Sequence, residues 1–347
     1  MKLDSRKLKV LACIVETYIK TGEPVGSKLL ASLLEYQVSP ATIRNDMASL
    51  FEMGLLEQPH TSAGRIPSHT GYRVYIDKLM NCKPLSQEEK DEIDALFNVK
   101  NPDPEKLLED AAQTLAEYTN CATISSTITP KSVCIRRVDL VIVGIRTVLI
   151  VVIATNGVIK NMTVRVDFNI TPEICDFFVK FANDRFVGKS VNSINTSFVS
   201  SMVVSLGDYS TIFTPLIAGI YELCKQIDEG LFFLGGETNI LSYKEFSPIA
   251  YDMLNLMKNK DEMLSLFADS EQGKVIIGKE NSHMQLAGSS VLVTKYKIGN
   301  NNIGAIGIIG PVRLDYAKLI PHIEYFAQTL GKLLTETLEE PYNTERS

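Results

Sequence analysis

The stretch VSPATIRNDMASLFEMGLLEQPHTSAGRIPS, residues 38–68, restricts the possible fold more than any other part of the chain. Ser39 is a favourable N-cap and Pro40 suits the first helical position, so we expect a helix to begin there. Gly54 is expected to end this helix, because glycine readily adopts the left-handed conformation that follows many helices. The stretch therefore predicts a short helix whose two ends are both marked chemically.

A β-hairpin is expected directly after this helix. Residues 55–59 and 65–67 have the character of two short strands on either side of the turn 60–64. The turn carries hydroxyl groups and a histidine, is followed by Arg65 and contains no carboxylate, which suits contacts with phosphates or with the minor groove of DNA. The alternative is an ordinary polar turn in which Gly64 supplies a positive φ angle.

Two further helices are expected before the helix that begins at Ser39. Residues 5–20 carry apolar side chains at helical spacing, and Gly22 follows as a stop signal. Residues 28–35 form a second short helix, and a turn of three residues separates it from Ser39. Two helices joined by so few residues are typical of a helix-turn-helix. Residues 1–80 are therefore predicted to form a winged helix-turn-helix that binds DNA.

The two faces of the third helix separate on a helical wheel. Ile43, Met47 and Leu50 recur at i, i+4 and i+7 and must point into the core. The opposite side presents Arg44 and Asn45, which suit guanine and adenine edges, beside alanines that permit close approach to a groove. Exposed Arg and Asn are often merely solvated, so this helix alone is weak evidence for DNA binding. The adjoining hairpin strengthens the interpretation that the helix binds DNA. The candidate DNA-contacting residues are Ser39, Ala41, Thr42, Arg44, Asn45, Ser49, His60, Thr61, Ser62 and Arg65.

Charge is divided unevenly along the chain. Of the formal net charge of −6, residues 1–80 contribute +2, from ten Lys and Arg against eight Asp and Glu, and the other 267 residues contribute −8. An amino-terminal nucleic-acid domain on an acidic body fits this division, although +2 alone is a weak signal. On the wheel of the third helix, the acidic Asp46 and Glu52 are expected nearer its flanks than its reading face.

The remainder of the chain predicts alternating helical and β regions. The polar run after residue 80 predicts a linker over 81–103. Strands rich in Val and Ile within 138–166 are joined by Asn156-Gly157, which is a strong hairpin signal. Further strands are expected between 274 and 309, and a long helix closes the chain.

These elements favour an α+β multidomain chain. Residues 104–167 and 239–347 are expected to form one α+β domain around a single antiparallel sheet. Residues 168–238 are too long for a connection and are expected to be an insertion with helices of its own.

The sequence contains no common catalytic or nucleotide-binding motif. GxxxxGK[ST], HExxH, GxSxG and GxGxxG are all absent, so we expect no enzyme, no catalytic residue and no cofactor. Six cysteines occur without a CxxC pair, which argues against a metal site or a disulfide framework. Arg313 and Asp315 are expected to pair with each other, line a pocket or cap the final helix, with structural roles favoured.

No membrane segment is expected either. The longest aliphatic run, Val148 to Ala154, is far shorter than the roughly 18–20 residues that a membrane helix needs. The first ten residues, MKLDSRKLKV, lack the apolar core of a signal peptide. A cytoplasmic location is therefore expected.

Similarity to a known family rests first on four blocks within residues 1–80, which are VETYIKTGEPVGSKLL, SPATIRNDMASL, GLLEQPHTSAGRIPS and GYRVYIDKLM. In this order they resemble the bacterial family of heat-inducible transcription repressors HrcA. Later blocks are GGETNILSYKEF, IGKEN (277–281) and GPVRLDY (310–316). The family more often has GPTRMDY in the last block, from which Val312 and Leu314 depart conservatively.

The resemblance implies both a fold and a function. It implies that the carboxy-terminal part is a GAF-like domain interrupted by an inserted α/β dimerisation domain. The implied function is repression of chaperone operons by a homodimer that binds double-stranded, inverted-repeat operator DNA and loses activity on heat shock. The chaperonin GroEL/GroES is implied as a modulator that keeps the repressor competent to bind.

Two other functions remain open from the sequence. The first is a transcriptional regulator that senses a metabolite through the GAF-like domain. The second, from another class, is a cysteine-based redox enzyme that uses Cys121 or Cys134. A stoichiometric small ligand would favour the first, whereas operator binding after replacement of all six cysteines would exclude the second.

Overall fold

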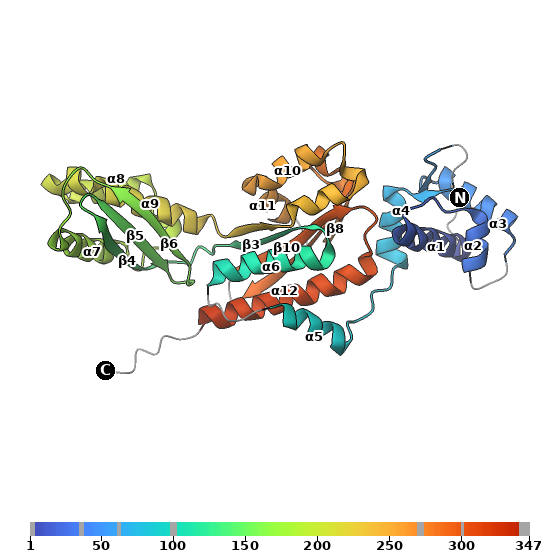
Figure 1. Cartoon of the computed structure of the whole chain (residues 1–347), viewed down its shortest axis with the longest axis horizontal. Coiled ribbons are helices and arrows are strands. Elements are labelled where there is room, and N and C mark those ends of the chain that lie inside the picture. The colour runs from blue at the N-terminus through green and yellow to red at the C-terminus, as the bar shows by residue number, and fades with distance from the viewer. Residues whose placement is uncertain are drawn as a thin grey trace.

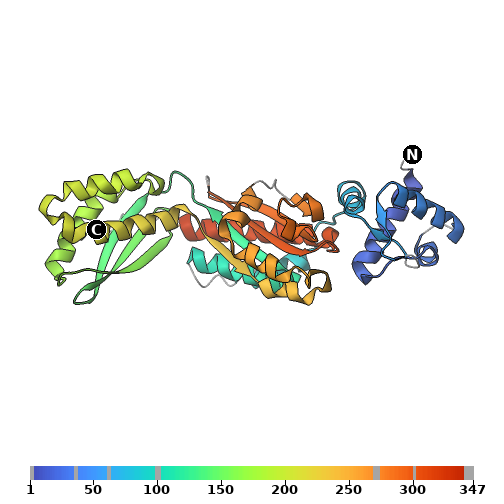
Figure 2. The same cartoon turned by 90° about the horizontal axis from the view of Figure 1, so that it is seen from above.

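The computed structural model describes residues 4–34, 38–60, 64–97, 103–268, 274–299 and 302–339, apart from the side chains of residues 208, 267, 268, 274, 302, 303, 338 and 339. The chain forms an elongated row of three units (Figure 1). Helices of the amino-terminal unit lie at one end, a five-stranded sheet lies in the middle and a three-stranded sheet lies at the other end, as Figure 2 also shows. This mixture of helix and sheet confirms the α+β class. Within the described part of the chain, no helix is both long enough and apolar enough to cross a membrane.

The amino-terminal unit packs short helices against a two-stranded hairpin. Its elements are α1 (Ser5–Thr21), α2 (Ser27–Leu33), α3 (Pro40–Glu52), β1 (Leu56–Glu57), β2 (Ile66–Pro67), α4 (His69–Val74) and the π-helix η1 (Tyr75–Leu79). α1 begins at Asp4, whose carboxylate accepts the Lys7 N–H at 2.9 Å, and ends at Gly22 with φ of 69°. Leu11 and Ile14 of α1 are fully buried, as are apolar residues of α2 and α3. The predicted apolar stripes therefore form the core of this unit.

The middle unit is a five-stranded antiparallel sheet with helices on both faces. The strands follow the order β7-β3-β10-β9-β8. Their bounds are β3 (Ala122–Ile128), β7 (Phe232–Gly235), β8 (Lys274–Ile277), β9 (Ser289–Ile298) and β10 (Asn302–Pro311). The helices are α5 (Gln87–Leu96), α6 (Pro104–Thr119), α10 (Ala250–Lys258), α11 (Lys260–Ala268) and α12 (Tyr316–Glu339), with short 3-10 turns η4 (Glu237–Ser242), η5 (Lys244–Phe246), η6 (Gly278–Glu280) and η7 (Met284–Leu286).

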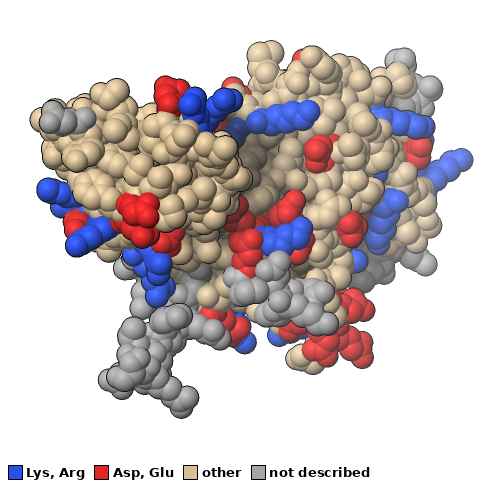
Figure 3. All heavy atoms as spheres, turned by 60° about the vertical axis from the view of Figure 1, so that its left-hand side comes forward, with Lys and Arg blue, Asp and Glu red and all other residues tan. Residues whose placement is uncertain are grey.

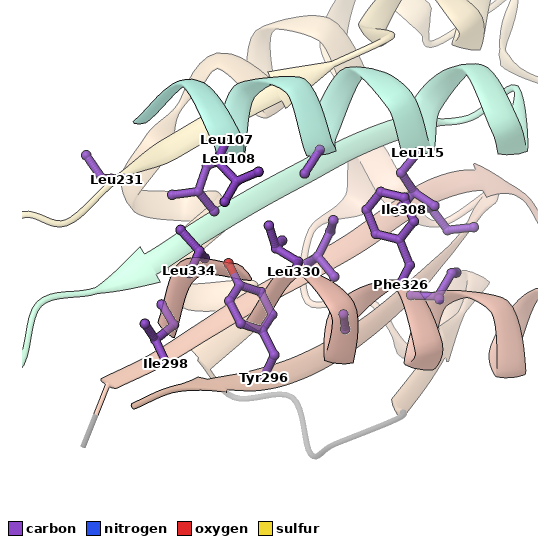
Figure 4. Packing of buried hydrophobic residues seen from close by; sticks show 14 of the residues in the cluster. Leu107, Leu108, Leu115, Leu231, Tyr296, Ile298, Ile308, Phe326, Leu330 and Leu334 are labelled. Carbon is purple, nitrogen blue, oxygen red and sulfur yellow. The ribbon is translucent and has the colours of Figure 1, made fainter. Parts of the chain in front are cut away.

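One face of this sheet carries the larger part of the core. Leu108 and Leu115 of α6 and Phe326 and Leu330 of α12 point toward each other and toward Ile308 of the sheet (Figure 4). Alternate residues of the same strands face the other side, where α10 and α11 cover them. The sheet is thus buried between two layers of helices.

The polar segment predicted as a linker over 81–103 is only partly a linker. Residues 87–96 form α5, which starts with a capping box between Ser86 and Glu89. Phe97 at its end packs on Phe326 with ring centroids 4.5 Å apart, and Tyr325 donates a hydrogen bond to Asp94 at 3.0 Å. The prediction of a linker was wrong for the residues of α5. Although this helix is mostly polar, two buried apolar residues are enough to hold it against α12.

The third unit contains a separate sheet, so the prediction of one sheet is wrong. Its elements are β4 (Ile135–Gly144), β5 (Thr147–Ala154), β6 (Ile159–Arg165), α7 (Pro172–Phe186), η2 (Val191–Ser193), α8 (Thr196–Ser205), η3 (Gly207–Tyr209) and α9 (Ser210–Asp228). The Asn156-Gly157 hairpin is confirmed, with Gly157 at φ of 77°, but its strands pair only with described strands of this unit. By sheet membership the unit begins with β4, whereas the sequence placed its start at 168.

Strand β3, the last element of the middle unit before the third unit, was not predicted from the sequence. Thr123, Ser125 and Ser126 are buried within it, so the apolar alternation that marks a strand is missing. β3 pairs with β7, which follows the third unit in the chain. The chain therefore leaves the middle sheet after β3 and returns to it at β7.

Asn120 ends α6 in the left-handed region, at φ of 53°. Replacing it with alanine should lower the free energy of unfolding by about 1 kcal/mol. Alanine is disfavoured in the left-handed region because, unlike asparagine, it has no polar side chain that can form a local hydrogen bond there. Glycine at this position should be neutral or slightly stabilising. Urea denaturation of the two variants tests this, and equal midpoints for alanine and glycine would contradict it.

Candidate nucleic-acid interface

Helix α3 begins and ends where the sequence predicts. The Ser39 hydroxyl accepts the Thr42 N–H at 3.1 Å, and Pro40 occupies the first turn. At the other end Gly54 has φ of 72°, and its N–H donates to the Phe51 carbonyl at 2.9 Å. Both predicted ends of the helix are therefore confirmed.

One face of α3 is open to solvent. Ala41, Arg44, Asn45 and Ala48 are exposed, while Ile43, Met47 and Leu50 are buried as predicted. Small alanine side chains lie beside the longer Arg44 and Asn45, so a groove can come close to the backbone while the two polar side chains reach base edges. Ser39 and Thr42 lie at the amino-terminal end of the helix, where its partial positive charge favours an anion such as phosphate.

Asp46 and Ser49 do not lie where the helical wheel placed them. Asp46 is only 3% exposed and accepts two hydrogen bonds from Arg6 of α1, at 2.8 and 3.0 Å. Ser49, a candidate DNA contact, is 6% exposed on the same side. The helical wheel identifies the buried face from apolar residues alone. It therefore missed the buried Asp46 carboxylate, which is stabilised by Arg6, 40 residues away. Ser49 is therefore buried in this conformation and lies outside the exposed face of α3.

The hairpin lies beside α3 and is tied to the start of α2. Leu56 pairs with Pro67 in antiparallel register. Arg65 and Val25 exchange two backbone hydrogen bonds of 2.9 Å, which extend the hairpin by a third short segment. A Cβ on Gly64 would lie 2.4 Å from the Val25 carbonyl oxygen. Gly64 is not among the described residues with positive φ, so the positive φ expected for an ordinary polar turn is wrong. Gly64 instead permits the close approach of the Val25 backbone.

Arg65 connects the hairpin to α3. Its guanidinium carbon lies 4.9 Å from the centre of the Phe51 ring, which is a cation–π contact. Its Nε is buried without a hydrogen-bond partner among the described residues. His60 is exposed at the other side of the turn. The candidates Thr61 and Ser62 fall outside the described residues.

Two contributors to this surface were missed by sequence analysis. Phe51 is 43% exposed and supports Arg65, and Arg6 anchors α3 through Asp46. Phe51 follows Arg44 by seven positions, so its place on the exposed face of α3 could have been found from helical spacing. Arg6 could not, because nothing local to its sequence identifies Asp46 as its partner.

Replacing Arg6 with alanine should destabilise the amino-terminal unit by about 2 kcal/mol, because the Asp46 carboxylate would stay buried without its charged donor. Asp46→Asn should cost less, since Arg6 is 47% exposed and water can solvate it. The double variant should lose less than the sum of the single losses. Denaturant unfolding measures all three; strictly additive losses would show that the pair is not coupled.

The remaining chemistry-bearing residues have structural surroundings. Burial raises the pKa of Cys121 to about 11, which disfavours the thiolate needed for catalysis. Arg313 pairs with Glu245, and Asp315 accepts the Lys318 N–H at 3.3 Å at the start of α12. Within the described residues, no group of three or more His, Cys, Asp and Glu side chains could hold a metal ion.

Comparison with known proteins identifies relatives over nearly the whole chain. Residues 105–320 match the family model described as "HrcA protein C terminal domain". The "Heat-inducible transcription repressor HrcA" of Acetivibrio thermocellus is 37% identical over 331 residues, which is 94% of each chain. That of Clostridium botulinum (strain Eklund 17B / Type B) is 35% identical over 338 residues, covering 96% of this chain and 98% of the relative.

A solved structure has the same overall fold. It bears the name "Crystal structure of a hypothetical protein at 2.2 A resolution" and aligns with a TM-score of 0.70 and 25% identity, covering 97% of this chain and 100% of that chain. The relatives are named as transcription repressors, a class that is not enzymatic, in agreement with the absence of a catalytic motif. The chain belongs to the HrcA family of heat-inducible transcription repressors.

Proposed function

We propose that the protein represses chaperone operons by binding, as a homodimer, to inverted-repeat operator DNA. The observation that carries this proposal is the exposed face of α3, where Arg44 and Asn45 stand between alanines on a helix anchored from behind by Arg6. Such a face fits the major groove, and the hairpin beside it makes residues 1–80 a winged helix-turn-helix.

The proposed contacts divide into two kinds. Arg44 and Asn45 read base edges, and Ala41 allows the helix to approach them. Ser39 and Thr42 lie where phosphates would meet the positive end of α3, while His60 and Arg65 extend the contact along the backbone. Thr61 and Ser62 remain proposed phosphate contacts from the sequence alone.

The homodimer is proposed to form through the three-stranded sheet. Helix α9 covers the face of this sheet that contains Ile150, and Met162 and Val164 of β6 point to the same helix. On the opposite face the cross-strand partners Val141, Leu149 and Thr163 lie side by side, and Val141 is 50% exposed. The same face continues through the adjoining pairs, where the apolar Val151, Ile153 and Ile159 lie beside the ion-paired Arg137 and Asp139.

This open face is proposed to be covered by the same face of a second copy. Ile159 at the edge of the face is 52% exposed. Figure 3 shows the end of the molecule that carries this unit, and a broad part of its surface bears neither acidic nor basic side chains. A two-fold interface of this kind buries the same patch on both subunits. The unit from β4 to α9 is then the inserted dimerisation domain, and the five-stranded unit is the GAF-like domain.

Heat regulation is proposed to act through the fraction of protein that is competent to bind. Operator affinity falls in proportion to that fraction, so a chaperonin such as GroEL/GroES can regulate by refolding the repressor. When heat-unfolded proteins occupy the chaperonin, the competent fraction falls and the operons are released. This regulation places the repressor in the cytoplasm with the chromosome. Operator titration with and without chaperonin tests it, and an unchanged active fraction would separate this chain from such regulation.

Selection of binding sites from random double-stranded DNA tests the core of the proposal. We expect an inverted repeat whose half-sites are separated by about 34 Å or a multiple of it, because both reading helices must meet the same face of the duplex. Enrichment of a single half-site without a repeat would contradict the homodimer. Failure to enrich any sequence would contradict the repressor function itself.

A further inference from the structure

Helix α4 links the DNA-reading unit to the middle unit, and on one side it is fixed to the end of α3. The Ser68 hydroxyl donates to the Gly54 carbonyl at 2.6 Å, and the Ser68 N–H donates to the Leu55 carbonyl at 3.1 Å. A Cβ on Gly71 would lie 2.1 Å from the Leu55 carbonyl oxygen. Only glycine allows this approach, so α4 packs directly against the backbone that follows α3.

On its other side α4 is held by the middle unit through Arg73. The Arg73 guanidinium donates to both carboxylate oxygens of Glu280, with Nε at 2.9 Å from Oε1, and its Nη2 also donates to the Val275 carbonyl at 2.6 Å. Glu280 itself accepts the Ile277 N–H at 2.9 Å. Burial alone would raise the pKa of Glu280, but hydrogen bonds from Arg73 and from the Ile277 N–H lower it overall, so the pair is ionised at neutral pH.

Two further close contacts surround this ion pair. The rings of Tyr72 and Tyr316 meet edge to face with centroids 6.2 Å apart, and both residues are almost completely buried. The His69 ring lies against Gly278, where a Cβ would be 1.9 Å from Nδ1. Beside them, Arg313 paired with Glu245 lies against the end of α1 at Gly22.

Apart from Val275, the residues of the middle unit in these contacts come from three blocks of sequence outside the amino-terminal unit. Glu280 and Gly278 belong to IGKEN (277–281), Arg313 and Tyr316 belong to GPVRLDY (310–316), and Glu245 belongs to GGETNILSYKEF. Far apart in sequence, they meet around α4 and the end of α1. We refer to this set of contacts as the α4 junction.

We propose that the α4 junction fixes the orientation of each reading helix and thereby sets the half-site spacing that the dimer accepts. This inference rests on the proposed function. A dimer interface at the far end of the molecule can dictate the distance between two α3 helices only if every connection between them is stiff (Figure 1). With a loosened α4 junction, the segment after η1 would act as a flexible tether and several spacings would bind comparably.

The test is operator binding by Arg73→Gln in the full-length protein as a function of spacer length. DNAs carry the selected inverted repeat with its spacer changed by 1, 2 or 5 base pairs, and a further DNA carries one half-site. For the wild type, 5 added base pairs place the half-sites on opposite faces of the duplex and should weaken binding about 100-fold. For Arg73→Gln the same change should weaken binding less than about 10-fold, while half-site affinity stays unchanged.

Control variants make the outcome decisive. Lys106→Gln breaks two exposed ion pairs on α6 and should keep the wild-type spacer profile. Glu280→Gln removes the charge from the middle unit without touching the reading unit and should repeat the effect of Arg73→Gln. A wild-type spacer profile in both junction variants would overturn the inference. An equal loss of affinity for half-site and full-site DNA would also overturn the inference. That result would mean that Arg73 is needed for the reading unit to fold. A wild type with no preference for repeats would instead refute the proposed function.

Discussion

Replacing Arg44 with alanine should relax base preference at one position of each half-site, with a loss of discrimination of about 1–3 kcal/mol per half-site. Arg44 is exposed near the middle of α3, so its removal leaves the core of the amino-terminal unit intact. Competition binding between the selected operator and single-base variants measures the effect. Asn45→Ala should relax a neighbouring position to a similar degree.

Two matched variants distinguish base reading from general attraction to DNA. Lys20→Ala removes an equal charge from the exposed end of α1 and should leave the base preference unchanged. Arg65→Ala should weaken binding to all sequences similarly, because Arg65 supports the hairpin through Phe51 and faces the backbone in the proposed complex. If Arg44→Ala lowered affinity uniformly on every sequence, the assignment of α3 as the reading helix would be wrong.

Placing a charge on the open face of the three-stranded sheet should separate the dimer and reduce operator affinity by about 100-fold. Val141→Glu puts one carboxylate on each subunit of a two-fold interface, where the like charges are desolvated and repel. Because Val141 is already 50% exposed, the fold of the protomer should tolerate the substitution. The loss on DNA arises because a monomer binds one half-site without the advantage of the second.

Sedimentation at micromolar concentration measures the oligomeric state directly. The matched control is Val204→Glu, which places the same charge at a 78% exposed position on α8 of the same unit. The control should remain a dimer. If Val141→Glu remained a dimer while Val204→Glu became a monomer, the interface would lie on the helices and the proposed face would be wrong.

Elements whose signals are local were predictable. The ends of α3 depend on Ser39, Pro40 and Gly54, and the β5–β6 hairpin depends on Asn156-Gly157; each signal acts within a few residues. The exposed positions of Arg44 and Asn45 followed from the apolar period of the same helix. For the same reason most of the candidate DNA-reading face was predictable from the sequence.

Burial of polar residues was not predictable in this way. Asp46 and Ser49 were placed outside the core because helical spacing identifies only apolar faces, yet Arg6 draws Asp46 inward from 40 positions away. β3 was missed because its buried Thr and Ser residues do not form an apolar pattern. The cost of burying these groups is offset by partners that are distant in sequence.

The sequence by itself determined the helix that carries Arg44 and Asn45, the hairpin beside it and the family of the chain, because these follow from local chemistry and from motifs. Only the tertiary structure decided which strands share a sheet and what surrounds α4. Strand partners are chosen by packing between segments more than 100 residues apart, as β3 and β7 show. The junction of Arg73 with Glu280 spans 207 positions in the same way. No local pattern encodes such contacts, since each is stabilised only after the whole chain has folded.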